Sequence, residues 1–421
     1  MAELSKALES IRIVNAYGLV TRLSGGLMPQ EPEGLFDLAY RSSYDVVDLQ
    51  CLASDIVTGV TGAEAAIVTN GAAAGLLLAA AACLARQDAA IMDRLPTPGP
   101  VREIIVGRSH RNAYDHALRA AGAELREVGI PDIVSGAGVR DVELWEFETA
   151  IGPGTAAILY VARHGAQPAL EELCALAKRH AVPVIVDAAA QLPPKENLWR
   201  FLQAGADLVV FSGGKAIMGP QASGILCGRR DLVASALLQN LDLDVDASDR
   251  RRILDSSLFH GIEFRGFPHH GIGRSAKVGK ETIVPFLFAF ERFATRGDEG
   301  FRQEQAALCA DLSARLAGSN SVACRTVVDH PKFRFPLVEL TTEGLSPGSF
   351  TKLRDGLAAL QPSIRVGFFK DHPPSLLLNL SALRREDVAY LADSLLGELR
   401  AAQSETTPAT SARPAVAVSQ A

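Results

Sequence analysis

This 421-residue sequence has no cluster of cysteine and histidine residues. The six cysteines lie far apart, form no CxxC pair and have no histidine at metal-ligand spacing, so neither a disulfide framework nor a zinc site is indicated. Most fall in apolar segments, which is typical of free thiols buried in a protein of the reducing cytoplasm. We therefore expect no bound metal. The cysteines are Cys51, Cys83, Cys174, Cys227, Cys309 and Cys324.

Runs of basic residues are absent as well. The net charge is -6 and the calculated pI is 5.9, and no stretch gathers five or more Lys and Arg. This excludes the electrostatic footprint typical of proteins that bind nucleic acid or anionic membranes. The first 18 residues have no apolar core of signal-peptide type, and the most apolar stretch, 71–85, is shorter than the roughly 20 residues of a membrane span. We expect a cytoplasmic protein.

The residues that are present describe an ordinary globular protein, with 48% apolar and 21% charged residues and room for two or three domains. Between residues 56 and 230, short apolar runs alternate with amphipathic helical patterns. Such runs predict a mostly parallel sheet covered on both faces, and hence an α/β fold. The predicted strands are 65–69, 103–107, 156–162, 183–189, 207–213 and 223–228.

The chain divides into four expected regions. Residues 1–55 form an N-terminal segment that contributes to the small domain and to dimer contacts. Residues 56–280 form the large α/β domain, and residues 281–402 form a smaller α+β domain. Residues 403–421 hold Ser, Thr, Pro and Ala without periodicity, which predicts a disordered tail.

A lysine follows an apolar run in the stretch FSGGKAIMGPQASGIL, residues 211–226. Ligands of open α/β sheets bind beyond the carboxyl ends of the strands. Lys215, partly shielded from water at such a position, would favour its neutral amine and could form a Schiff base with an aldehyde. Ser212 and the small residues 213 and 214 suit a phosphate. A solvated loop lysine is the alternative interpretation.

An aspartate ends the apolar run PVIVD. A carboxylate at the close of a fully apolar strand needs a cationic partner, and a pyridinium nitrogen would suit Asp187, because the carboxylate keeps that ring protonated and electron-withdrawing. A helix N-cap is the alternative, since turn or helical chain follows directly.

The stretch TNGAAAG, residues 69–75, places a helix start directly after a strand. Free backbone N–H groups and the positive end of the helix dipole could bind a phosphate there, although Asn-Gly before a helix is also an ordinary turn. The sequence has neither GxGxxG nor GxxxxGK[ST], so a single phosphate is favoured over a dinucleotide or a nucleoside triphosphate.

Further polar residues follow other predicted strands. His110, in GRSHRNAYD, could stack on a flat aromatic ligand or could cap a helix. Arg163, His164 and Gln191 could hydrogen-bond to ring or substrate oxygens. A basic loop, GIGRSAKVGKE, suits a phosphate or carboxylate, and a solvated surface turn is its alternative reading. Its basic residues include Arg274 and Lys277.

The turn at residue 69, the strand ending in Asp187 and the stretch around Lys215 together resemble a pyridoxal-phosphate enzyme of the aspartate-aminotransferase superfamily, fold type I. They follow that family's order: phosphate turn, stacking residue, ring-nitrogen aspartate, Schiff-base lysine. VDAAAQLPPKENL, GADLVVFSGGKAIMGPQASGIL and RSAKVGKETIV resemble the branch that contains bacterial selenocysteine synthase and D-glucosaminate-6-phosphate ammonia-lyase. The resemblance covers residues 10–400 and implies an aspartate-aminotransferase-like α/β fold with a smaller α+β domain.

Carried over by position, the resemblance assigns the Schiff base to Lys215, the pyridine nitrogen to Asp187 and the ring face to His110. Gln191 is a further cofactor contact, although it falls four residues after the aspartate where related sulfur-transferring enzymes have a glutamine three after. Met218 stands where many relatives have arginine, which points to a different substrate. The phosphate contacts fall on Asn70, Gly71, Ala72 and Ser212.

The implied activity is that of a pyridoxal-phosphate-dependent lyase for an amino acid or a sugar-derived amino acid. Lys215 would remove the α-proton, and loss of a β-hydroxyl, protonated by His110 or His164, would give a 2-keto acid and ammonia. Transamination, racemisation and aldol cleavage start from the same Schiff base and stay open, as does a non-catalytic ligand-binding homologue. Candidate substrate-binding residues are Arg163, His164, Arg274, Lys277 and Arg365.

Selenocysteine synthase itself is disfavoured. That enzyme carries an N-terminal tRNA-binding region, whereas the motif RIVNAYG already begins at Arg12 here, and the acidic balance does not favour tRNA. Enzymes of this fold build each active site from two subunits. The resemblance therefore implies a homodimer or a higher homo-oligomer whose ligand is a small molecule.

Overall fold

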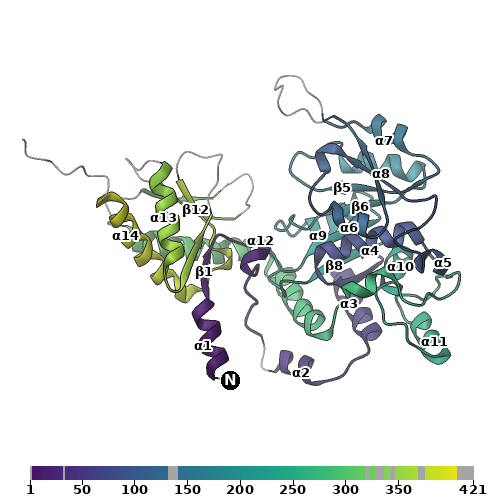
Figure 1. The fold of residues 1–421 in the computed structure, drawn as a ribbon, viewed down its shortest axis with the longest axis horizontal. Helices are drawn as coiled ribbons and strands as arrows, with labels where there is room; N and C mark the ends of the chain where they lie inside the picture. The colour runs from purple at the N-terminus through teal and green to yellow at the C-terminus, as the bar shows by residue number, and fades with distance from the viewer. Residues whose placement is uncertain are drawn as a thin grey trace, which may run out of the picture. The chain divides into compact units, whose positions relative to one another are not determined.

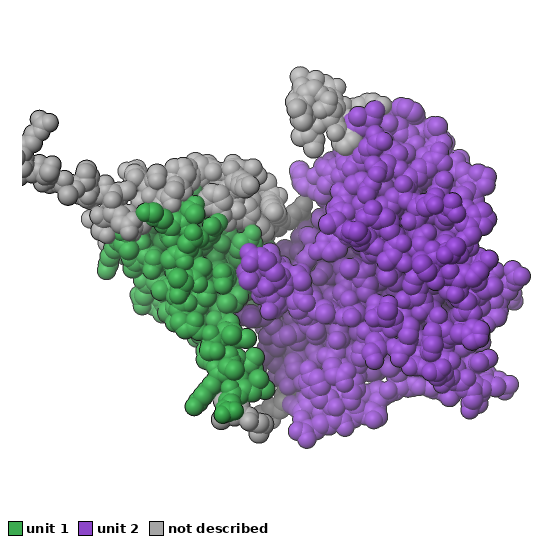
Figure 2. Space-filling view, viewed as in Figure 1, with its two compact units in different colours: residues 1–18, 299–421 green, residues 19–298 purple. Residues whose placement is uncertain are grey.

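The chain folds into two compact units. The computed structural model describes residues 2–31, 34–130, 141–317, 323–328, 335–341, 347–367 and 375–404. Unit 1 consists of residues 1–18 and 299–421, and unit 2 of residues 19–298 (Figure 2). In the described ranges, no helix combines the length and the apolar character that a membrane crossing requires. The expected disordered tail lies outside the described residues from residue 405 onward.

The division between the units differs from the boundaries expected at residues 55 and 280. Residues 19–55 belong to unit 2, where helix α3 (Val46–Thr61) packs against strand β2 (Ala65–Thr69). The long helix α12 (Lys280–Leu316) is interrupted at Gly297, whose φ of 67° and ψ of -176° are not helical. Because Phe286 and Phe290 place the first part of α12 in the core of unit 2, the boundary falls at this interruption.

A seven-stranded sheet forms the centre of unit 2, and Figure 1 labels three of its strands, β5, β6 and β8. The strand order is β2-β8-β7-β6-β5-β3-β4. Only β8 runs antiparallel to its neighbours, which confirms the predicted mostly parallel sheet. Strand β4, with the sequence ELREV, was not predicted, because its charged residues belong to an edge strand rather than to a buried one. Besides β2, the strands are β3 (Glu103–Gly107), β4 (Glu124–Val128), β5 (Thr155–Val161), β6 (Val184–Asp187), β7 (Leu208–Ser212) and β8 (Gly224–Gly228).

Each face of this sheet has its own apolar core. Along β6, Val184 and Val186 lie in the first core and Ile185 lies in the second. Since side chains alternate along a strand, Asp187 points to the second face. The first face is covered by α3, α7 (Leu144–Ala150), α8 (Leu170–Arg179), α9 (Asn197–Gln203) and the start of α12, and the second by α4 (Gly71–Ala85), α6 (Asp115–Ala120) and α10 (Arg230–Leu238).

Helix α4 is the central helix of the second face. Its sequence, GAAAGLLLAAAACLA, is apolar on all sides. Such a helix has no stripe for water and is stable only when neighbours surround it. Small residues let it approach the sheet closely. A Cβ at Gly75 would lie 2.9 Å from Val210 Cγ1, and one at Gly224 would lie 2.8 Å from Ala72 N. The first turn of α4 is therefore fixed against β7 and β8.

Unit 1 contains two small sheets. Strands β1 (Ile13–Ala16) and β11 (Ser363–Val366) are parallel, and the antiparallel order β12-β10-β9 joins Ser375–Leu378, Leu337–Thr341 and Ala323–Val327. This confirms the predicted smaller α+β domain. Its helices are α1 (Ala2–Ile11), the end of α12, α13 (Pro347–Ala359) and α14 (Val388–Ser404); the other helices of unit 2 are α2 (Leu35–Arg41), α5 (Ala89–Met92) and α11 (Ala247–Asp255).

Candidate active site

Four strands of unit 2 bring polar residues to one edge of the sheet. The parallel strands β5, β6 and β7 end at Val161, Asp187 and Ser212, and Val161 is the register partner of Asp187. Strand β2 runs in the same direction and ends at Thr69. Both Thr69 and Ser212 pair with Gly224 of β8, so they lie in one row across three strands.

Lys215 lies in a tight turn directly after β7. Met218 N donates to Lys215 O at 2.9 Å, and Gly219 N donates to Gly213 O at 2.9 Å. Burial lowers the pKa of the Lys215 ammonium, and attraction to Asp187 opposes this shift. Within the described ranges, Lys215 Nζ forms no hydrogen bond. The turn thus presents a partly buried amine that is not tied to an ion pair.

A glycine strap, Gly25–Gly26, packs on this lysine turn. Gly26 N donates to Gly214 O at 3.0 Å. Gly25 has a φ of 71°, and a Cβ there would lie 2.4 Å from Gly214 O, while a Cβ at Gly26 would lie 3.1 Å from Lys215 O. Larger residues do not fit without moving the turn, so the strap holds the backbone that carries Lys215.

Asp187 is buried, with 7% of its surface exposed. Its Oδ1 accepts a hydrogen bond from Ala189 N at 3.0 Å. Burial raises the pKa of the carboxyl group, whereas this hydrogen bond and the charge of Lys215 act in the opposite direction. Oδ2 accepts no hydrogen bond from the described residues. Asp187 can therefore accept one from a ligand N–H.

The first turn of α4 offers backbone donors at the same edge. Asn70 occupies the N-cap position but its side chain makes no capping hydrogen bond. The first N–H groups of a helix have no partner within the helix. In α4 these groups include the N–H groups of Gly71 and Ala72, which could donate to an anion. Space around Gly71 is free, since a Cβ there would meet nothing within 4 Å. Ser212 adds a hydroxyl, since it lies in the same row of the sheet as Thr69, two residues before α4.

His110 ends the short helix η2 (Arg108–His110) and is fixed by backbone groups on both ring nitrogens. Its Nδ1 accepts from Val161 N at 3.0 Å, so Nε2 carries the proton and donates to Gln167 O at 2.8 Å. Burial lowers the pKa of the imidazole, which favours the neutral ring. With both nitrogens engaged, His110 offers a ring face rather than a proton.

The remaining candidates after β5 and β6 are less enclosed. Arg163 and His164 are exposed, and Arg163 Nη2 forms an ion pair with Asp141 at 3.1 Å. Gln191 is half-buried in the loop after β6, where its backbone oxygen accepts from Asn197 Nδ2 at 2.6 Å. These residues lie past the carboxyl ends of their strands, as the sequence predicts.

The basic candidates farther along the chain lie in two other parts of the fold. Arg274, in η3 (Ile272–Ala276), forms an ion pair with Asp242 at 2.6 Å, and Lys277 is exposed. Their loop is held by Asn240 Nδ2, which donates to Gly273 O at 2.7 Å. Arg365 belongs to β11 of unit 1 and is half-buried.

Sequence reasoning missed Asp115, the first residue of α6. It is 1% exposed and accepts a hydrogen bond from Arg111, while its Oδ1 is buried without a partner among the described residues. The charge of Asp115 acts on Asp187 and helps to raise the pKa of that carboxyl group. An acidic residue at the start of a helix is common for local reasons, so no sequence pattern indicates this proximity.

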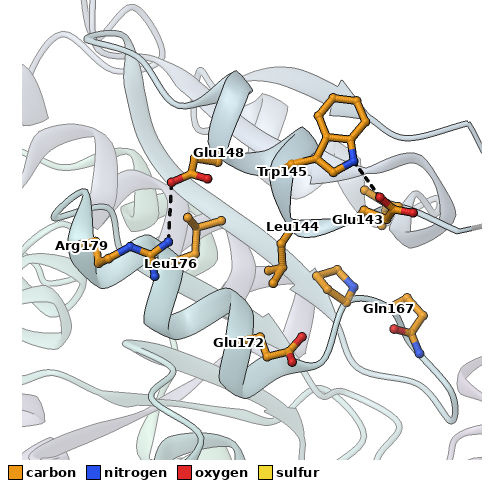
Figure 3. Close-up of a pocket in the computed structure, with 10 residues that line it drawn as sticks. Glu143, Leu144, Trp145, Glu148, Gln167, Glu172, Leu176 and Arg179 are labelled. Atoms are coloured by element: carbon orange, nitrogen blue, oxygen red, sulfur yellow. Dashed lines mark hydrogen bonds and ion pairs between the residues drawn. The ribbon is translucent and has the colours of Figure 1, made fainter.

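A groove of about 520 Å³ lies between α7 and α8 (Figure 3). Four of its polar side chains form two pairs: Trp145 Nε1 donates to Glu143 at 2.7 Å, and Arg179 lies 3.5 Å from Glu148. None of the residues that line it was predicted as a site residue. Gln167 links the groove to the candidate site, since its backbone carbonyl accepts the hydrogen bond from His110.

A family model described as SelA, L-seryl-tRNA selenium transferase, matches residues 48–244. This range includes the first turn of α4, His110, Asp187 and Lys215. The matched part of the chain is thus the part of unit 2 that carries the candidate site.

Two curated relatives match longer stretches. 5'-C-glycyluridine monooxygenase-decarboxylase from a Streptomyces species is 31% identical over 385 residues, 89% of this chain and 86% of that protein. D-glucosaminate-6-phosphate ammonia lyase from Salmonella typhimurium is 29% identical over 294 residues, 67% of this chain and 68% of that protein. A solved structure of D-glucosaminate-6-phosphate ammonia-lyase superposes with a TM-score of 0.76 at 22% identity, covering 95% of this chain and 99% of that chain, which is a likeness of fold.

Proposed function

This chain belongs to the SelA family of fold type I pyridoxal-phosphate enzymes, and from that premise we propose that it binds pyridoxal phosphate at Lys215 and acts on an amino acid or a sugar-derived amino acid. Its fold is aspartate-aminotransferase-like, with the seven-stranded, mostly parallel sheet of unit 2 and the smaller antiparallel sheet of unit 1.

One observation supports this proposal most strongly. Lys215 and Asp187 are enclosed at the ends of adjacent strands, and the charge of each affects the pKa of the other, but no hydrogen bond joins them. The free amine suits an aldehyde, and Asp187 Oδ2 suits a protonated ring nitrogen. The first turn of α4, with Ser212, suits a phosphate. These three kinds of group match the three polar ends of pyridoxal phosphate.

Pyridoxal phosphate, when bound, supplies an aldehyde that joins the substrate amine and a ring that withdraws electrons from the α-carbon. The residues of this chain provide the rest. Burial favours the neutral amine of Lys215, which can take a proton from the α-carbon at Nζ. Asp187 holds the ring nitrogen in its protonated form. His110, locked by Val161 and Gln167, provides a flat surface for the ring.

We propose β-elimination as the reaction, supported by the similarity to the ammonia lyase. A proton moves from the α-carbon to Lys215 Nζ, and a β-hydroxyl leaves as water after it receives a proton. Hydrolysis then releases ammonia and a 2-keto acid. His164, exposed past the end of β5, is better placed to give that proton than His110, whose two nitrogens are engaged.

Oxidative decarboxylation is a second candidate, because the match to 5'-C-glycyluridine monooxygenase-decarboxylase is longer and slightly more identical. Such a reaction breaks the bond from the α-carbon to the carboxylate and releases CO₂. O₂ is the oxidant: one of its oxygen atoms would be added to the α-carbon, which becomes a carboxamide carbon, and the other would leave as water. Both reactions require the same lysine and aspartate. They differ in the bond that is broken and in the need for oxygen.

The deciding experiment supplies purified protein with pyridoxal phosphate and then with β-hydroxy and sugar-derived amino acids, with and without O₂. Equal amounts of ammonia and 2-keto acid formed without O₂ and without an amino acceptor would support elimination. Release of CO₂ that requires O₂ would support the second candidate, and a strict need for a keto acid would indicate transamination. A protein whose absorbance does not change with the cofactor, or an active Lys215→Ala variant, would refute the proposal.

We further propose that the protein is at least a homodimer. Helices α2 and α3 and the loop between them expose large apolar side chains, a pattern that favours a protein interface. Sedimentation or light scattering of the full chain will measure the mass, and a monomer at micromolar concentration would contradict the proposal. The exposed residues are Leu38, Tyr40, Tyr44, Val46 and Leu52.

A further inference from the structure

Asp115 is a buried carboxylate to which the proposed function assigns no role. Its side chain is almost completely enclosed, at 1% exposed. Arg111 Nε donates to Oδ2, but Oδ1 is buried and has no partner among the residues that the structure describes. Leaving a buried acceptor without a hydrogen bond costs about 1–3 kcal/mol, and more when the group is charged. A fold that keeps such an oxygen at this edge of the sheet indicates a use for it.

Asp115 lies on the face of the sheet to which Asp187 points. Helix α6 begins at Asp115 and packs through Leu118 into the second core, the core that also holds Ile185 of β6. Asp187, two residues after Ile185, points to that core by the alternation of the strand. The segment that leads into α6 is fixed at the same place, because His110, five residues before Asp115, accepts a hydrogen bond from Val161 N, and Val161 is the register partner of Asp187. The charge of Asp115 accordingly contributes to the raised pKa of Asp187.

The charges around this pair form a short series. Lys215 and Asp115 are the charged groups that act on Asp187. Asp115 is in turn held by Arg111, whose other partner, Glu127 on β4, is more exposed. The series therefore runs from the surface at Glu127, through Arg111 and Asp115, to Asp187 at the end of β6.

We propose that Asp115 is a positioning residue that acts through Asp187 and, by adding a second negative charge at the end of β6, keeps the ring nitrogen of bound pyridoxal phosphate protonated. This inference rests on the proposed function. A cation beside two enclosed carboxylates is stabilised more than a cation beside one, because each contributes its own attraction in a medium of low dielectric. Arg111 holds the side chain of Asp115 in place through the hydrogen bond from its Nε to Oδ2.

A purely structural role for Asp115, as an acidic residue in the first turn of α6, makes a different prediction. In that case, its removal would destabilise the helix and leave the protonation of the cofactor unchanged. The absorbance of the bound cofactor against pH is therefore the readout that separates the two roles. Activity alone would not separate them.

The test uses the full chain reconstituted with pyridoxal phosphate, as wild type, Asp115→Asn and Glu127→Gln. Both variants remove one negative charge from the same arginine, but only Asp115 acts on Asp187. We expect Asp115→Asn to lower the pH midpoint of the cofactor absorbance by about one unit, since positive charge in the site loses an attraction. Glu127→Gln should leave the midpoint unchanged. An unshifted midpoint in Asp115→Asn, or equal shifts in both variants, would overturn the inference.

Arg111→Gln provides a second measurement if Asp115→Asn does not fold. Removing this positive charge should raise the same midpoint, and an unchanged or lowered midpoint would count against the inference. A wild-type protein that shows no cofactor absorbance would refute the proposed function itself. That result is seen before any variant is compared, so the two failures can be told apart.

Discussion

Asp187 in unit 2 and Asp387 in unit 1 are equally buried, at 7% exposed, but they are bound in different ways. Asp387 accepts hydrogen bonds from Arg12 Nη1 at 3.0 and 3.1 Å and from Arg384 Nε at 3.1 Å. Asp187 accepts one backbone hydrogen bond, and Lys215 acts on it without forming a second. Burial alone therefore does not distinguish a structural carboxylate from a functional one.

The two carboxylates differ in the groups that donate hydrogen bonds to them. In unit 1, two guanidinium groups satisfy Asp387 and tie the residue before β1 to the residues before α14, so the charge serves the fold. In unit 2, an oxygen of Asp187 and the amine of Lys215 form no hydrogen bond with the described residues, and the proposed function assigns both to a ligand. An enclosed charge without full partners costs free energy of folding. Such charges are therefore rare where they serve only the fold, and they are concentrated at functional sites.

Replacing Asp187 by Asn should have the largest effect on activity. The amide keeps the size of the side chain but loses the negative charge that, in the proposed function, holds the ring nitrogen of the cofactor protonated, so we expect kcat to fall by about 10²-fold or more. The free energy of unfolding of the cofactor-free protein should not decrease, because a buried charge has been removed. Steady-state kinetics and denaturant unfolding measure the two effects, and Asp387→Asn should show the reverse pattern.

Replacing Gly25 by Ala tests whether the glycine strap positions Lys215. The new Cβ would lie 2.4 Å from Gly214 O at a φ of 71°, so we expect a loss of about 2–3 kcal/mol in stability together with weaker binding of the cofactor. Gly62→Ala is the matched control, since Gly62 has a φ of 70° and open space around it. It should lose about 1 kcal/mol and bind the cofactor normally. Equal cofactor affinity in both variants would remove the strap from the site.

Replacing Asp387 by Asn should destabilise unit 1 without changing the chemistry. The loss of charge weakens three hydrogen bonds from guanidinium groups that are partly open to water, so we expect a decrease of about 1–2 kcal/mol in the free energy of unfolding. Activity per folded molecule should be unchanged, because Asp387 has no part in the proposed site. A large loss of kcat at full folding would break the distinction between the two carboxylates.

The sequence predicts unit 2 well where burial is uniform. The runs that became β2, β3, β5, β6, β7 and β8 are almost wholly apolar, because both of their faces are covered, and the lysine and aspartate stand out at their ends. Strand β4 was missed because one side of it is exposed and charged. Its residues alternate without the apolar run on which the prediction depended.

Contacts between distant segments could not be predicted in the same way. Asp115 carries no local sign that it lies near Asp187, 72 positions later, because their proximity comes from the packing of α6 against α4 in the second core. The same is true of Gly25, whose contact with Gly214 depends on how residues 19–26 cross the lysine turn. Sequence patterns report local burial, and these residues matter through tertiary contacts.

The smallest expected effect is in the pH dependence of stability of the cofactor-free protein, and it concerns Lys215. Burial lowers the pKa of its ammonium below the ordinary value of 10.5, so between the two values the unfolded chain binds more protons than the folded one. Stability therefore rises with pH across this window, and below it the cost of the buried charge is fully present. Asp187, whose pKa is raised, acts in the opposite sense, over a pH window that begins at the ordinary value of 3.8.

Lys215→Met removes that cost, so the cofactor-free variant should unfold at a higher denaturant concentration than wild type at pH 7. The gap should narrow as the pH rises towards 10.5, because wild-type Lys215 then loses its charge in the folded state first. Lys277→Met, at an exposed position, should show no such narrowing. A gap that stays constant from pH 7 to about 10, or a variant less stable than wild type at pH 7, would mean that Lys215 is satisfied in the folded chain as Asp387 is.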